Sequence, residues 1–210
     1  AEISLAANTW TQSGVFAREC PHGVAIVSEF GNRSFAKLEE SANRAAHQLR
    51  AMGLRSGDPV VLMCSNRPEF IEVLLAAMRI GLRLTPISTH LTTEEAQYIV
   101  NDCGAQFIFV EEGLSLAGQS GETIREICIG ANQHSQHTRV TGYAQWLDGG
   151  STEPVPSPEA GNLMLYTSGT TGRPKGVFRK EPDVVMPQYA GTFANYQPGD
   201  VALCCGPAYH

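Results

Sequence analysis

The stretch Tyr166-Thr167-Ser168-Gly169-Thr170-Thr171-Gly172-Arg173-Pro174-Lys175-Gly176 decides how the rest of this sequence is interpreted. The apolar run Leu163–Tyr166 directly before it predicts a buried strand that leads into a loop. The three glycines of the loop let backbone N–H groups come close to a ligand, and its four Ser and Thr hydroxyls are further donors. With Lys175 as a mobile positive charge, the loop forms a concave anion site suited to a polyphosphate.

The spacing of this loop does not fit two common phosphate-binding patterns. Counting from Gly169, a Walker motif needs glycine where Pro174 stands and Ser or Thr where Gly176 stands. The stretch does not contain the dinucleotide fingerprint Gly-x-Gly-x-x-Gly either. The remaining alternative is a flexible Gly/Ser/Thr linker. We disfavour it because linkers do not carry Arg-Pro-Lys directly after a buried strand.

The composition is that of an ordinary globular α/β protein. The chain has 210 residues, of which 42% are hydrophobic and 17% are charged. Its 15 basic and 21 acidic residues give a net charge of −6, which argues against nucleic acid as the main partner. No apolar run approaches the roughly 18–20 residues of a membrane span, and the N-terminal residues lack a signal-peptide pattern. We therefore expect a cytoplasmic protein, with peripheral membrane association left open.

The cysteines and histidines do not form a recognisable redox or metal motif. The six cysteines lack Cys-x-x-Cys spacing, and Cys204-Cys205, in an apolar run, are interpreted as core thiols. His134 and His137 lie in a polar stretch without Cys, Asp or Glu at ligand spacing, so we interpret it as a solvated loop and predict no metal site. The Arg179–Glu181 cluster is interpreted as solvated surface.

Apolar runs alternate with helical patterns along the first half of the chain. The helix signals include a Ser34 cap closed by Gly53, a start at Asn66 followed by Pro68, and a capping box at 92–95. The expected helices cover residues 9–19, 34–53, 66–81 and 92–103, and the expected strands cover residues 24–27, 59–63, 82–87 and 106–110. Wholly apolar strands are typical of parallel sheets covered by helices. We therefore predict an α/β fold, with a layered, mainly parallel sheet and helices on both faces.

The second half of the chain has weaker patterns. We expect a helix-like run at Thr123–Ile127 and a proline-rich surface linker at 151–158. After the loop, residues 182–196 predict a helix and Val201–Cys205 predict another buried strand. We accordingly divide the chain into the first α/β units, an irregular connection and the phosphate-loop segment, at residues 1–110, 111–158 and 159–210.

Residues 166–176 resemble the phosphate loop of the acyl-adenylate-forming, or AMP-binding, superfamily. The signature of that superfamily is similar to Tyr-Thr-Ser-Gly-Thr-Thr-Gly-x-Pro-Lys-Gly, and the stretch matches it throughout. Further blocks resemble bacterial fatty acyl-CoA synthetases in order and spacing, at residues 66–70, 81–86, 91–98, 102–105 and, as a Pro-x-aromatic-His motif, 207–210. The chain is thus identified as the N-terminal part of the large domain of such an enzyme, over residues 9 to 210.

The resemblance implies an ATP-dependent acyl-CoA synthetase that acts on medium- or long-chain fatty acids. A carboxylic acid would attack the α-phosphate of ATP, giving acyl-AMP and pyrophosphate, and the thiol of coenzyme A would then displace AMP. Mg²⁺ is expected on the phosphates. The residues implied to contact the nucleotide phosphates are Thr167, Ser168, Gly169, Thr170, Thr171, Gly172, Lys175 and Gly176.

The resemblance also implies catalytic roles for two residues. Lys175 would neutralise pyrophosphate as it leaves. His210 resembles the residue between the acyl carboxylate and the α-phosphate, where it would steady the transferring group. The alternative for His210 is a buried histidine that is bonded to the backbone.

Two other functions stay open. One is an adenylation domain or ligase that passes the acyl group to a carrier protein. The sequence differs from many relatives at Arg179–Glu181, and this difference leaves the subfamily open. The other is a truncated, catalytically inactive nucleotide-binding or scaffold fragment. The adenine motif, the ribose-binding aspartate and the C-terminal catalytic lysine that the family implies are not found in residues 1–210. We therefore expect the isolated chain to be inactive and to self-associate through exposed apolar surface.

Overall fold

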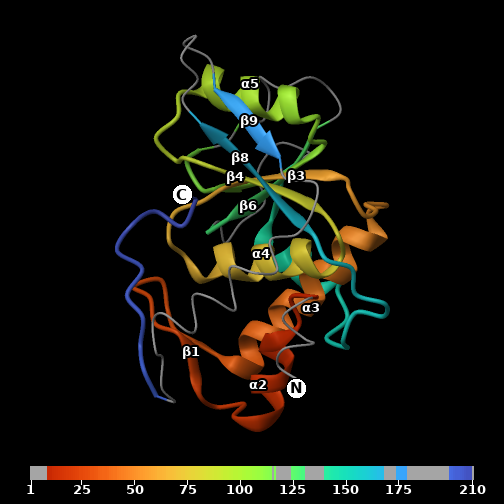
Figure 1. Cartoon of the computed structure of the whole chain (residues 1–210), viewed down its shortest axis with the longest axis vertical. Helices are drawn as coiled ribbons and strands as arrows, with labels where there is room; N and C mark the ends of the chain where they lie inside the picture. Colours follow the sequence, from red (N-terminus) through yellow and green to blue (C-terminus); the bar gives the residue numbers. More distant parts are fainter. Residues whose placement is uncertain are drawn as a thin grey trace.

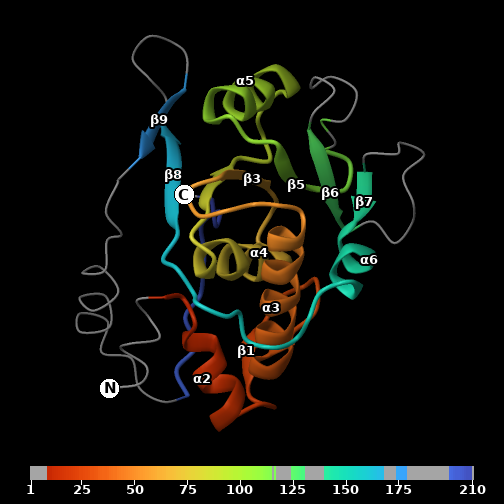
Figure 2. The same cartoon turned by 90° about the vertical axis from the view of Figure 1, so that its right-hand side faces the viewer.

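The computed structural model describes residues 9–114, 116, 124–130, 140–167, 174–178 and 199–209. Within these residues, the centre of the molecule is a seven-stranded sheet (Figures 1 and 2). The strands are β3 (Pro59–Met63), β4 (Arg83–Ile87), β5 (Phe107–Glu111), β6 (Arg125–Ile129), β7 (Val140–Gly142), β8 (Asn162–Thr167) and β9 (Lys175–Phe178). They lie in the order β7-β6-β5-β3-β4-β8-β9, and every neighbouring pair is parallel except β8 and β9, which are antiparallel.

Helices cover the sheet on both faces, so the predicted fold class is confirmed. The helices are α2 (Gln12–Glu19), α3 (Phe35–Ala51), α4 (Pro68–Arg79), α5 (Thr93–Cys103) and α6 (Tyr143–Asp148). Figure 2 shows α5 on one face of the sheet and α4, backed by α3, on the other. A small antiparallel hairpin of β1 (Val24–Ile26) and β2 (Arg33–Ser34) precedes α3.

Successive side chains of the central strand β3 point to opposite faces of the sheet and divide the apolar core into two clusters. Val60 and Leu62 of β3 pack with α4 and α6, while Val61 and Met63 pack with α5. All four side chains are at most 2% exposed, because β3 has a strand on each edge and helices on each face. We call the two sides of the sheet the α4 face and the α5 face.

Local sequence signals account for several helix ends. Ser34 Oγ accepts a hydrogen bond from the Lys37 amide at 3.2 Å and caps α3, and Gly53 follows that helix with φ 93°. At α5, the Thr92 hydroxyl accepts from the Glu95 amide at 3.3 Å, while the Glu95 carboxylate accepts from the Thr92 amide at 2.8 Å. The predicted capping box is confirmed.

Two predicted helical features are wrong. Asn66 does not cap α4, because the helix begins at Pro68 with Arg67 in the N-cap position and no side-chain cap bond. The helix-like run Thr123–Ile127 overlaps β6, which pairs with β5 in parallel register. Extended backbone places Ile127 and Ile129 together on the α4 face, and this long-range pairing overrides the local helical pattern.

Two predicted buried strands are corrected as well. Leu163–Tyr166 lies in β8, but Leu163 and Leu165 are each 38% exposed on the α4 face. Val201–Cys205 is neither a strand nor buried, and Val201 is 84% exposed. Among the strands described, none pairs with this segment, and an apolar run without a partner strand stays at the surface. Cys204 and Cys205 are therefore exposed thiols, not core thiols.

A buried ion-pair cluster joins the first three long helices. Arg79, 1% exposed, donates to Glu39 at 3.0 Å and to Ser13 at 3.0 Å, so α4, α3 and α2 share one charge-paired contact. No helix in the described part of the chain is long and apolar enough to cross a membrane. The predicted helix at 182–196, the His134–His137 stretch and the Arg179–Glu181 cluster lie outside the described residues.

Candidate nucleotide-binding site

The predicted phosphate loop connects two antiparallel strands. β8 enters it at Thr167 and β9 leaves it at Lys175, and these two residues are paired partners at the base of the loop. Directly opposite residues lie on one side of a sheet, so Thr167 and Lys175 share a face, and both are exposed. A hydroxyl and an ammonium group therefore belong to paired positions where the loop begins and ends, and Figure 1 shows β8 and β9 side by side.

The tyrosine before Thr167 anchors the loop on the opposite side of the sheet. Tyr166 packs against the α5-face cluster, and its hydroxyl donates to Asp102 Oδ2 of α5 at 2.6 Å. Burial first, and the hydrogen bond to the Asp102 carboxylate second, raise the pKa of Tyr166. The phenol consequently stays protonated as a donor, and the base of the loop is tied to the end of α5.

Gly176 has a packing role that the sequence did not indicate. It is the paired partner of Tyr166, and a Cβ at this position would overlap the methyl group of Met164 and lie 3.1 Å from Tyr166 Cζ. A side chain here would push the tyrosine away from its place. The glycine is thus needed to seat Tyr166, apart from any contact with a ligand.

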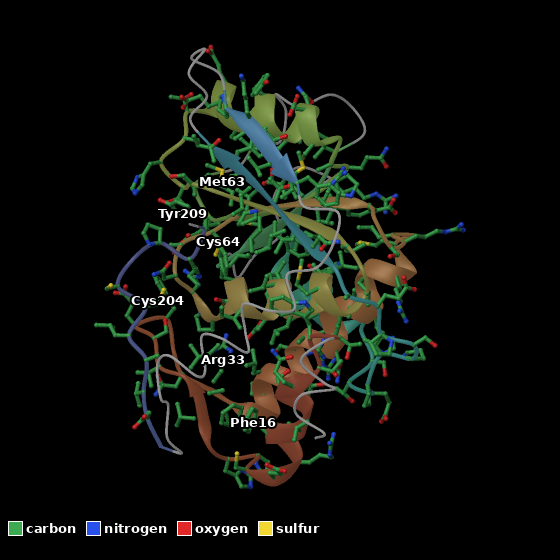
Figure 3. All side chains as sticks on the ribbon, in the orientation of Figure 1. Phe16, Arg33, Met63, Cys64, Cys204 and Tyr209 are labelled. Carbon is green, nitrogen blue, oxygen red and sulfur yellow. The ribbon has the colours of Figure 1, made fainter. Side chains whose placement is uncertain are left out.

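The second part of the site lies at the carboxyl end of β3. Chain connections diverge there, because β3 leads to β4 on one side while β5 leads to β6 on the other. In open α/β sheets, ligands bind outside the carboxyl ends of strands at such a switch point. The residues that follow β3 are Cys64, Ser65 and Asn66, and the α4-face cluster contains Cys64 and is contacted by Tyr209, both of which are labelled in Figure 3.

A segment from the other end of the chain docks at this place. Asn66 Nδ2 donates to the Gly206 carbonyl at 2.9 Å, and the Ala208 amide donates to Asn66 Oδ1 at 2.7 Å. Ala208 and Tyr209 also pack against the α4-face cluster. The predicted Pro-x-aromatic-His motif is therefore held at the switch point up to Tyr209.

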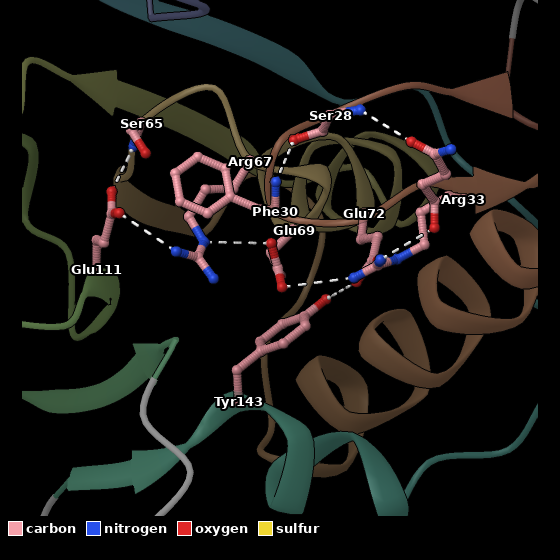
Figure 4. Close-up of polar contacts among 10 residues, drawn as sticks. Ser28, Phe30, Arg33, Ser65, Arg67, Glu69, Glu72, Glu111 and Tyr143 are labelled. Atoms are coloured by element: carbon pink, nitrogen blue, oxygen red, sulfur yellow. Dashed lines mark hydrogen bonds and ion pairs between the residues drawn. The ribbon is translucent and has the colours of Figure 1, made fainter.

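A chain of charged and polar side chains surrounds the switch point (Figure 4). It starts where Glu111, at the end of β5, accepts from the Ser65 amide at 2.8 Å and pairs with Arg67 at 3.5 Å. It continues through pairs of Arg67 with Glu69 at 3.4 Å and of Glu69 with Arg33 at 3.4 Å. We call this series of linked residues, from Ser65 and Glu111 to Glu72 and Tyr143, the polar chain.

The polar chain ends in a buried acid. Glu72 accepts from Arg33 at 2.7 Å and from the Tyr143 hydroxyl at 3.0 Å. Burial raises the pKa of Glu72, and the Arg33 contacts oppose that shift. Burial and the nearby Glu72 charge raise the pKa of Tyr143, so its hydroxyl remains a donor. These carboxylates are already paired, and the chain acts as a brace between elements.

The structure brings only part of the predicted site together. Thr167, Lys175 and Gly176 are described, whereas Ser168, Gly169, Thr170, Thr171, Gly172 and His210 lie outside the described residues. The sequence missed Tyr166, Asp102 and Asn66 as supporting residues. Their signal was present in the motif blocks at 66–70 and 102–105, but their partners are distant in sequence. The described residues contain no group of three His, Cys, Asp or Glu side chains that could hold a metal ion.

The sequence profile of the AMP-binding enzyme family matches residues 15–210 of this chain. The chain belongs to this family. Among curated relatives of this AMP-binding chain, a fatty acid–[acyl-carrier-protein] ligase, ScoC, of Streptomyces coeruleorubidus is 28% identical, over 92% of the chain and 38% of that protein. A crotonobetaine/carnitine–CoA ligase of Salmonella agona is 29% identical, over 88% of the chain and 37% of that protein. The chain thus spans less than two fifths of the length of these relatives.

Solved structures show the same fold. The o-succinylbenzoate CoA synthetase of Bacillus subtilis, in complex with its acyl-adenylate intermediate, superposes with a TM-score of 0.70 at 23% identity, over 97% of this AMP-binding chain and 50% of that one. The anthranilate CoA ligase AuaEII, in complex with anthranoyl-AMP, gives a TM-score of 0.69 at 22% identity, over 79% of the chain and 34% of that one. The expected N-terminal part of the family's large domain is therefore present.

The packing of Gly176 predicts a stability effect. Gly176→Ala should lower the free energy of unfolding by about 1–3 kcal/mol, because the new methyl group must displace Met164 or Tyr166. Urea unfolding of the chain measures this effect. Gly206→Ala is the matched control, since no atom lies within 4 Å of its built Cβ. Equal stabilities of the two variants would contradict the packing role.

Burial predicts that Cys64 is chemically inert although it lies beside the site. It is fully buried, and burial first, with the Glu111 charge second, raises the pKa of its thiol. At pH 8, iodoacetamide should modify Cys64 more than about a hundredfold more slowly than the exposed Cys204 and Cys205. Mass spectrometry of timed samples gives the rates, and the difference should vanish in urea. A Cys64 rate within tenfold of the exposed thiols in native protein would show this prediction to be wrong.

Proposed function

We propose that the protein carrying this chain is an ATP-dependent acyl-CoA synthetase for medium- or long-chain fatty acids. Its membership of the AMP-binding enzyme family is the observation that carries this proposal. The paired Thr167 and Lys175 at the base of the loop support it, because they place a hydroxyl and a positive charge where a polyphosphate would approach. Residues 159–210 would form the phosphate-loop segment, joined to the α/β units of residues 1–110 through the connection at 111–158.

The proposed reaction has two steps. A carboxylate oxygen attacks the α-phosphorus of ATP, the bond to the β-phosphate oxygen breaks, and pyrophosphate leaves. The sulfur of coenzyme A then attacks the acyl carbon, and AMP leaves. Positioning and charge neutralisation carry most of the first step, since a carboxylate and a polyanion must meet. Mg²⁺, when bound, neutralises phosphate charge, and phosphate oxygens would be its main ligands.

In this proposal the hydroxyls, the glycines and the lysine of the loop each have a different role in binding the phosphates. The hydroxyls and amides of Thr167, Ser168, Thr170 and Thr171 donate to the β- and γ-phosphates. Gly169, Gly172 and Gly176 allow the close approach, and Lys175 balances the charge of departing pyrophosphate. His210 steadies the group in transfer as a hydrogen-bond donor.

A second function, acyl transfer to a carrier protein, is favoured by one specific observation. The relative of Streptomyces coeruleorubidus is named as a fatty acid–[acyl-carrier-protein] ligase. The two functions share the adenylation step and differ in the acceptor. Supplying either coenzyme A or a phosphopantetheine-bearing carrier protein to the preformed acyl-adenylate therefore separates them.

Removal of the lysine at the loop base tests the adenylation step. Lys175→Ala should lower acid-dependent pyrophosphate release from ATP by at least about tenfold, since one charge-assisted contact to the phosphates is lost. The assay is run on the chain and on any longer protein that carries it, with acids from acetate to palmitate. Lys37→Ala, an exposed lysine on α3, is the control. Unchanged release in the Lys175 variant would contradict its role.

The exposed apolar strip on the β8–β9 hairpin supports a proposal of self-association for the isolated chain. The large apolar side chains exposed on the α4 face of this hairpin are Leu163, Leu165 and Val177. Sedimentation velocity should show mass that increases with concentration, and Val177→Glu should shift the chain toward monomer. Val27→Glu, on the exposed β1–β2 hairpin, is the control. A wild-type chain that stays monomeric at every concentration would overturn the proposal.

A further inference from the structure

Asn66 uses its whole side-chain amide to hold a distant backbone. Its Nδ2 donates to the Gly206 carbonyl at 2.9 Å, and its Oδ1 accepts from the Ala208 amide at 2.7 Å. The backbone of residues 206–209 forms a bend followed by a turn, and none of the described strands pairs with it. The Asn66 amide can bond to both backbone groups, because it carries one donor group and one acceptor in fixed geometry.

The loop that presents Asn66 is itself braced on both sides. The preceding residue, Ser65, donates its amide to Glu111 at 2.8 Å, and the following residue, Arg67, pairs with the same carboxylate at 3.5 Å (Figure 4). The Arg67 amide also donates to the Ser65 carbonyl at 2.7 Å, which closes a tight turn around Asn66. Asn66 is exposed, so water competes for its bonds, but the turn holds the side chain in one place.

The held backbone leads directly to the end of the Pro-x-aromatic-His motif. Val201 and Leu203, upstream of the contact, are 84% and 87% exposed, whereas Ala208 and Tyr209 pack against the α4-face cluster. The change from exposed to packed backbone therefore occurs where Asn66 binds. His210 follows Tyr209 by one peptide bond.

We propose that Asn66 is a positioning residue for the adenylation step. By fixing the backbone of residues 206–208 at the carboxyl end of β3, it holds the segment that leads in sequence to His210, the residue proposed to act on the transferring group. This inference rests on the proposed function. It assigns Asn66 no contact with substrate, and it separates this residue from the phosphate loop, whose base is anchored independently through Tyr166 and Asp102.

Hydrogen exchange tests the contact without reference to activity. In the wild-type chain, the Ala208 amide should be protected, and Asn66→Ala should speed its exchange at least about fivefold. Asn66→Asp keeps the acceptor for this amide, so Ala208 should stay closer to wild type. Gln145→Ala is the control, because Gln145 also carries a side-chain amide and is exposed on α6. Unchanged Ala208 exchange in Asn66→Ala would overturn the proposal.

Kinetics test the positioning role. In a longer, active protein that carries this chain, Asn66→Ala should lower kcat of acid-dependent pyrophosphate release about tenfold, while KM for ATP changes less than about twofold. Asn66→Asp should fall between, and Gln145→Ala should match wild type. A raised KM with unchanged kcat would overturn the positioning role. A longer, folded wild-type protein that has a protected Ala208 amide but releases no pyrophosphate with any acid would overturn the proposed function, and the positioning role with it, while leaving the contact itself established.

Discussion

The structure depends on one constraint, namely that β3 is hydrogen-bonded along both edges. The chain leaves β3 for β4 on one side and must cross back to place β5 on the other. Parallel pairing requires a helical crossover in each of these two connections. Because β4 and β6 lie on opposite sides of the β3–β5 pair, the chain after β3 and the chain after β5 turn in opposite directions. The space between them receives the polar side chains of Ser65, Arg67 and Glu111. The same arrangement that buries the core therefore creates the place where the site is built.

The polar chain gives this place its rigidity. Its acids and guanidinium groups are mostly buried, and a buried charge without a partner is costly, so alternative arrangements of the loops are disfavoured. Glu72 illustrates the balance, because burial raises its pKa while Arg33 opposes the shift. The brace extends from Tyr143 of α6 to Ser65 after β3, two elements that are far apart in the sequence. The turn that carries Asn66 is consequently held in place by the contacts of Ser65 and Arg67 with Glu111.

Features encoded by neighbouring residues could be predicted from the sequence. The Ser34 cap and the Thr92–Glu95 capping box depend on contacts within a few residues, and a continuous apolar run marks the bounds of β3. Features that depend on distant partners could not. Residues 125–127 of the predicted helix-like run form a strand because β5 offers an edge, and Val201–Cys205 stayed exposed because the described strands offer it none. Asn66 carries a good capping residue type, yet its partners lie 140 and 142 residues away.

The same reasoning applies to the predicted phosphate loop. Its composition predicted a polyphosphate ligand, but not the contact between Tyr166 and Asp102 that anchors the base of the loop. Tyr166 and Gly176 lie toward the α5 face, whereas Thr167 and Lys175 lie toward the α4 face by strand alternation. Ala208 and Tyr209 pack against the α4-face cluster too, so the loop base and the backbone held by Asn66 belong to one side of the sheet. Their anchors are separate, however, since Asp102 belongs to α5 and Asn66 to the turn after β3. Two elements that share a face but not an anchor can be disturbed one at a time, so a substitution at Asp102 and a substitution at Asn66 affect different parts of the candidate site.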